Sequence, residues 1–68
     1  DQLDRAIGDF TAALRIDPQY RPAYVQRGLA YDRQNRRDLA LADLRRALAL
    51  AETAADRAAI QAEIDRLQ

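Results

Sequence analysis

The chain has 68 residues, and its eleven Arg, with no Lys, balance eleven Asp and Glu to a formal net charge of zero. A basic excess normally accompanies nucleic-acid or acidic-membrane binding, so this balance disfavours both kinds of partner. A chain of this length buries only about 60% of its unfolded surface. Because fifteen of its residues are alanines, we expect a shallow core made by close approach of backbones.

The lack of Cys rules out disulfides and thiolate metal sites, and it favours a reducing, cytoplasmic compartment. No apolar run approaches the length of a membrane span, and no signal peptide is visible. Since the chain opens on Asp1 rather than Met, we expect it to be part of a longer protein.

Residues 2–16 are predicted to form the first helix. Their large apolar side chains recur at intervals of four, three and four residues, which places them on one stripe of an amphipathic helix. Asp17-Pro18 ends this helix, because Pro lacks the N–H and the residue before Pro avoids the α region. The stripe consists of Leu3, Ile7, Phe10 and Leu14.

A second helix is predicted over residues 22–34, with Pro22 in its first turn. Gly28 in its interior costs about 1 kcal/mol relative to Ala. We therefore expect a neighbouring helix to touch the backbone at Gly28, through Ala40 or Ala47. Asn35 is suited to the left-handed conformation that closes a helix.

The third helix, predicted over residues 38–51, repeats the first. Asp4–Leu14 recurs as Asp38–Leu48 with a shift of 34 residues, and five positions are identical. An internal period of this size is typical of stacked helical repeats. The identical pairs are Asp4/Asp38, Ala6/Ala40, Asp9/Asp43, Ala13/Ala47 and Leu14/Leu48.

A fourth helix is predicted to begin after Thr53, because Thr53-Ala54-Ala55-Asp56 has the form of a capping box with Asp in place of Glu. Short linkers between helices imply antiparallel neighbours, and no segment alternates as a strand does. The predicted fold class is therefore all-α with four helices. The stripe of the last helix is Ile60, Ile64 and Leu67.

The residue pattern resembles the tetratricopeptide repeat family. The resemblance implies antiparallel helix pairs stacked as a short right-handed superhelix. In a single domain over 1–68, residues 2–16 are then the second helix of a partial repeat, 21–52 a complete repeat and 53–68 a capping helix. The matching motifs are Tyr24-x2-Arg27-Gly28-x2-Tyr31, Ala40-x3-Leu44-x2-Ala47, and Ala6-x3-Phe10-x2-Ala13 followed by Asp17-Pro18.

Tyr24 stands where Trp is usual in the family, and three further features depart from its pattern. Arg27 stands where Leu is usual, and we expect its stem to pack while its charged head reaches water. Glu52 stands where Pro closes a repeat. The stripe of the last helix lies two residues late for a repeat in strict register, which favours a capping helix.

An enzyme is not expected, because the chain has no His, Cys, Ser or Lys from which to assemble a nucleophile and its base. Asp9 and Asp43 occupy equivalent repeat positions, where solvation or hydrogen bonds between helices explain them. The loop acids Asp17 and Glu52 are isolated, whereas a metal site needs clustered oxygen ligands. We predict neither a metal nor a cofactor.

Tyr24 and Tyr31 align with Gly28 and are interpreted as core rather than as a stacking platform, whereas Tyr20 could staple the turn or face a ligand. Five arginines form the densest basic region. Interleaved acids favour a solvated, self-compensated face, with contact to an acidic partner as the alternative. These residues are Arg33, Arg36, Arg37, Arg45 and Arg46, interleaved with Asp32, Asp38 and Asp43.

The resemblance also implies a binding face on the helix over 22–34, which in the family lines a concave groove for a partner peptide. Some members grip a terminal carboxylate there with Lys and Asn. Here Val25 and Leu29 replace such polar residues, so an apolar groove with a charged rim is expected. Another part of the parent protein or a second copy could instead cover it. The predicted partner-binding residues are Pro22, Val25, Leu29, Asp32 and Arg33.

The sequence thus predicts a non-catalytic protein–protein interaction module whose partner is a protein or peptide segment. The alternative is a structural module that forms a homo-oligomer through its first helix. That helix lacks a repeat mate, and a long exposed apolar stripe usually finds a cover.

Overall fold

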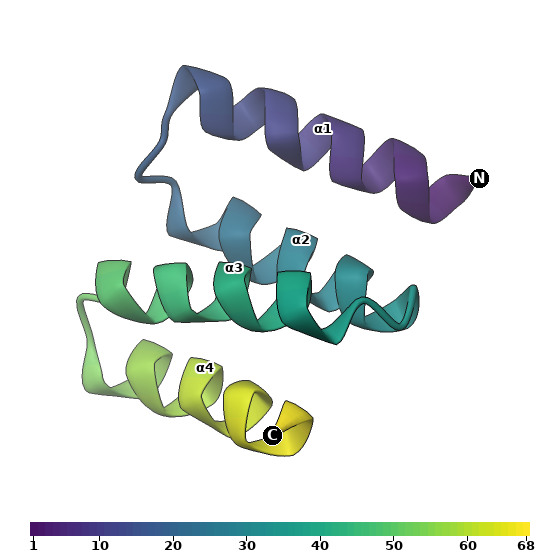
Figure 1. The fold of residues 1–68 in the computed structure, drawn as a ribbon. Coiled ribbons are helices and arrows are strands. Elements are labelled where there is room, and N and C mark those ends of the chain that lie inside the picture. The colour runs from purple at the N-terminus through teal and green to yellow at the C-terminus, as the bar shows by residue number, and fades with distance from the viewer.

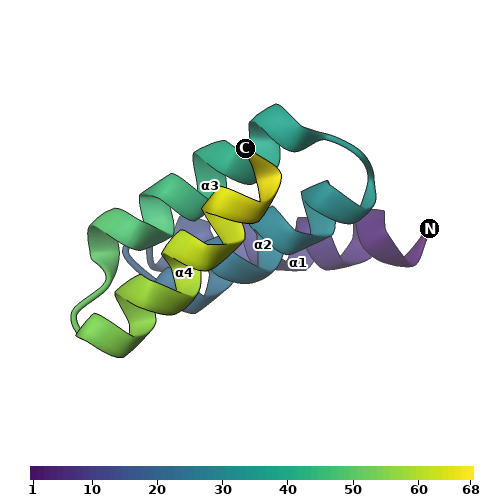
Figure 2. The ribbon, with the colours of Figure 1, turned by 90° about the horizontal axis from the view of Figure 1, so that it is seen from below.

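The computed structural model describes residues 1–68 as four helices and no strand, which confirms the predicted fold class. Each helix packs antiparallel to the next one along the chain (Figure 1). The first and last helices lie at opposite ends of the stack, as the second view also shows (Figure 2). The helices are α1 (Gln2–Ile16), α2 (Arg21–Arg33), α3 (Arg37–Leu50) and α4 (Ala54–Leu67).

Local signals set the helix ends. Asp1 caps α1 by accepting a hydrogen bond from the Asp4 N–H at 2.8 Å. Thr53 caps α4 in the same way from the Asp56 N–H at 3.0 Å, as predicted. Asn35 adopts the expected left-handed conformation, with φ of 62°. Neither α2 nor α3 has a side-chain cap, so these helices depend on packing.

The core is centred on α3, where Ala40, Leu44 and Ala47 are each 0% exposed. The apolar stripe of α4 completes the same cluster, as predicted. Gly28 lets α2 approach this surface closely. A Cβ atom at Gly28 would lie 3.2 Å from the Ala40 carbonyl oxygen and 3.1 Å from Leu44 Cγ. The expected backbone contact therefore exists, and it falls at Ala40.

Ion pairs join α2 and α4 at both ends, and they show that these two helices run in the same direction. Arg21 at the start of α2 lies 3.4 Å from Asp56 at the start of α4. Arg66 near the end of α4 lies 3.0 Å from Asp32 near the end of α2. Exposed pairs of this kind are worth up to about 1 kcal/mol each, so they set orientation more than stability. No helix is both long and apolar enough to cross a membrane.

Candidate partner-binding surfaces

A partly buried ion pair joins α2 to α3. Arg27 donates from Nε and Nη2 to the two carboxylate oxygens of Asp43, each at 2.7 Å. Its Nη1 also donates to Thr11 Oγ1 of α1 at 3.2 Å. The side chain of Asp43 is 8% exposed and that of Arg27 is 19% exposed. The expectation that the Arg27 head reaches water is therefore wrong, because a carboxylate on the facing helix binds it inside.

The surroundings of Arg27 favour its charged form. Its hydrogen bonds to Asp43 raise the pKa of Arg27 above the ordinary value, while partial burial acts in the opposite direction. The guanidinium carbon also lies 5.7 Å from the ring centre of Tyr24 and 5.9 Å from that of Tyr31. Both rings are half-buried against the core, as predicted, whereas Tyr20 is 49% exposed.

The five predicted binding residues do not share one cleft. Val25 is half-buried against the core cluster of α3 and α4, and Asp32 faces α4 through its ion pair with Arg66. Leu29 and Arg33 lie on the other side of α2, toward α1. Pro22, in the first turn of α2, is half-buried and lines neither of the clefts described below. The structure thus divides this face between two neighbouring helices.

A small apolar cleft lies between α1 and α2, and we call it the α1–α2 cleft. Its volume is about 200 Å³, and five of its seven lining residues are hydrophobic. Arg33 stands at its edge, exposed and without an ion pair. The lining residues are Leu3, Ala6, Phe10, Gln26, Leu29, Ala30 and Arg33.

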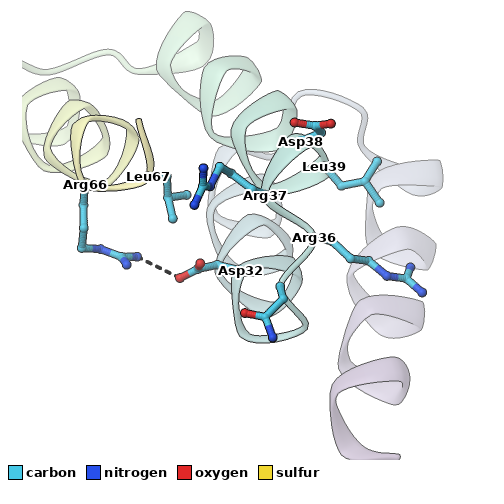
Figure 3. Close-up of a pocket in the computed structure, with 8 residues that line it drawn as sticks. Asp32, Arg36, Arg37, Asp38, Leu39, Arg66 and Leu67 are labelled. Carbon is cyan, nitrogen blue, oxygen red and sulfur yellow. Dashed lines mark hydrogen bonds and ion pairs between the residues drawn. The ribbon is translucent and has the colours of Figure 1, made fainter.

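A larger polar cleft of about 710 Å³ lies at the turn between α2 and α3, beside the end of α4. Figure 3 shows Arg66 reaching across it to Asp32. Hydrogen bonds to Glu63 and then to Asp32 raise the pKa of Arg66. Leu39 lines the same cleft and is 45% exposed. The ion pair between Arg66 and Asp32 thus already occupies part of this cleft.

The five clustered arginines, which lie on α2, on α3 and in the turn between them, make no ion pair. Of the interleaved acids, Asp32 forms an ion pair with Arg66 and Asp43 forms one with Arg27. Asp38 forms no ion pair. Charge compensation in this region therefore does not take the form of ion pairs among these residues. The acidic side chains also do not gather in threes, as a metal site would require.

Comparison with known proteins identifies the repeat in part of the chain. Residues 22–53 match the family model described as "Tetratricopeptide repeat". This chain carries a tetratricopeptide repeat. Over 50 residues it is also 48% identical to "Tetratricopeptide repeat protein 36" of Caenorhabditis elegans, an alignment that covers 74% of this chain and 28% of that relative. No solved structure gives a significant match.

The matched residues begin at Pro22 in α2 and end at Thr53, so they span the α2–α3 pair and the Arg27–Asp43 contact inside it. Tetratricopeptide repeats generally serve as protein–protein interaction modules and are typically non-catalytic. The family therefore points to protein partners in general.

Proposed function

We propose that the chain is a non-catalytic protein–protein interaction module that presents one face of α2, within a concave helical groove, to a partner segment. The observation that carries this proposal is the apolar α1–α2 cleft beside an unpaired Arg33. In the proposed domain division, residues 2–16 are a partial repeat, 21–52 a complete repeat and 53–68 a cap. The proposed binding residues are Pro22, Val25, Leu29, Asp32 and Arg33.

Within this face, Leu29 and Arg33 make the contacts inside the α1–α2 cleft. Leu29, Leu3 and Phe10 offer an apolar floor that one partner side chain can fill, and burying such a side chain contributes about 1.5–3 kcal/mol. Arg33 at the edge can bind a carboxylate of the partner through a charge-assisted hydrogen bond.

The other three residues of the face also hold α2 in place. Val25 packs against the core shared by α3 and α4, and Asp32 binds Arg66 of α4. Pro22 fixes the start of the helix. A partner that lies along α2 therefore meets a helix whose position is already set on its other side.

Peptides selected from a random library for binding to the wild-type chain test this assignment. Leu29→Glu should lower the affinity of the selected peptides for the chain by about tenfold or more, because it places a charge on the apolar floor. Leu39→Glu is the matched control, since Leu39 is an exposed leucine outside this cleft, and it should leave their affinity unchanged. Circular dichroism checks that both variants fold. Equal binding to Leu29→Glu and the wild type would refute the site.

Self-association is the second candidate function, and the open side of α1 favours it. Leu3, Ile7 and Phe10 are only partly buried, whereas Leu14 is buried. A second chain could cover this stripe and form a homo-oligomer. Sedimentation equilibrium should then show a dimer or larger species at tens of micromolar. A monomer at that concentration removes this alternative.

A further inference from the structure

We propose that Arg27 couples α1 to α3, so that Asp43 on α3 determines how firmly α1 is held against α2. Three helices meet at this side chain, because Arg27 alone forms side-chain hydrogen bonds with both α1 and α3. This role goes beyond the proposed partner-binding face, which does not include Arg27.

The helices α1 and α3 have little direct contact with each other. The main packing contacts of the stack join helices that follow one another along the chain, so that α1 packs against α2, and α3 packs against α2 and α4. No hydrogen bond or ion pair runs directly from α1 to α3. A change in α3 therefore reaches α1 through α2, and Arg27 is the polar side chain of α2 that contacts both.

Asp43 fixes the orientation of the Arg27 guanidinium. Nε and Nη2 donate to the two carboxylate oxygens, each at 2.7 Å, and this two-point contact leaves the planar group little freedom to rotate. The ring centres of Tyr24 and Tyr31 lie 5.7 and 5.9 Å from the guanidinium carbon and restrict it further. With the plane fixed in this way, Nη1 points to α1, where it meets Thr11.

Thr11 is prepared to accept this bond. Its hydroxyl donates its only proton to the Ile7 carbonyl oxygen at 2.7 Å, which leaves the lone pairs of Oγ1 to accept from Arg27 Nη1 at 3.2 Å. A chain of hydrogen bonds thus runs from the carboxylate on α3 to the hydroxyl on α1, and the bonds in such a chain strengthen one another. At 3.2 Å the last bond is at the long end of the ordinary range, so it depends on the direction that Asp43 gives to its donor.

The identity of residue 27 makes the two contacts dependent on each other. A leucine there would contact each neighbouring helix separately, because apolar contacts are not directional. The rigid fork of an arginine instead binds both neighbours with one planar group. Release of the group by α3 therefore weakens the grip on α1.

A double-mutant cycle on this chain tests the coupling. Thr11→Val removes the hydroxyl and keeps the shape of the side chain, and it should raise the unfolding equilibrium constant about fivefold, as the loss of one ordinary hydrogen bond does. In the presence of Asp43→Asn, the same change should raise that constant by less than about twofold, because Nη1 no longer points at Thr11. Urea denaturation measures both factors, and sucrose added to every sample keeps the double variant folded at the start of the titration.

Two controls separate coupling from a general loss of stability. Thr11→Ser keeps the hydroxyl, so its effect on the unfolding constant should be the same with and without Asp43→Asn. Asp38→Asn makes the same chemical change at an exposed acid of α3 that has no ion pair, and Thr11→Val should keep its fivefold effect beside it.

Either of two results would overturn the inference. One is an equal effect of Thr11→Val with and without Asp43→Asn, which would show that the two contacts are independent. The other is an effect of Thr11→Val below about twofold in the otherwise unchanged chain, which would show that the bond to Arg27 does not hold α1.

Discussion

The two helices that share a sequence pattern, α1 and α3, lie in different surroundings. Ala40 and Leu44 of α3 are 0% exposed because α2 and α4 cover two sides of that helix. Their equivalents in α1, Ala6 and Phe10, are only partly buried because α1 packs against α2 alone. Burial at equivalent positions thus follows the number of neighbouring helices. Matched substitutions in the two helices should therefore differ in effect.

The largest difference is expected at the central apolar position. Leu44→Ala should lower the free energy of unfolding by about 3 kcal/mol, because it opens a cavity in a fully enclosed site. Phe10→Ala should cost less than half as much, since water already reaches that ring. Urea denaturation followed by far-UV circular dichroism measures both values. Equal losses would show that another molecule covers α1 in solution.

A smaller difference is expected at the equivalent acids. Asp43→Asn should cost about 2 kcal/mol, because it leaves the guanidinium of Arg27 beside a neutral amide in a site that is mostly shielded from water. Asp9→Asn should change the free energy of unfolding by less than about 0.5 kcal/mol, as is usual for an exposed position. Thermal unfolding of both variants against the wild type checks this. A similar loss of unfolding free energy in the two variants would contradict the expected difference between α3 and α1.

The smallest effects, of opposite sign, are expected at the two glycines. A Cβ atom at Gly8 would meet no neighbouring helix or side chain within 4 Å, so Gly8→Ala should raise the free energy of unfolding by about 1 kcal/mol through helix propensity alone. Gly28→Ala gains the same propensity but crowds α3, and it should cost about 1 kcal/mol net. Chemical denaturation of the two variants measures the sign of each change in unfolding free energy. A stabilising Gly28→Ala would mean that α3 moves away freely.

Most of the helical framework follows from local signals. Pro18 and Asn35 mark ends that the structure places within one or two residues of those positions, and the Thr53 cap starts α4 as predicted. Periodicity also identified Leu44 and the stripe of α4 as core. These features depend on neighbouring residues along one helix, so the sequence carries them directly.

The contact between Arg27 and Asp43 was missed, although its signal was present. Both are charged residues at positions that face a packed helix, and they lie on the two helices of one repeat. Considered singly, Arg27 suggests solvent, and Asp43 leaves solvation and a hydrogen bond between helices both open. Considered together, they form a pair that replaces an apolar contact. The predicted binding face was also divided in the structure, because Asp32 faces α4 while Leu29 faces α1.

By itself, the sequence determined the four helices, their order and the residues that could form a core, because periodicity, caps and the 34-residue repeat are properties of the chain. Only the tertiary structure decided which copy of the repeated pattern is covered. Asp43 is held by Arg27 inside the stack, while Asp9 stays exposed at its end. The physical reason is that burial depends on which helix lies opposite, and two similar segments at different places in a stack have different neighbours.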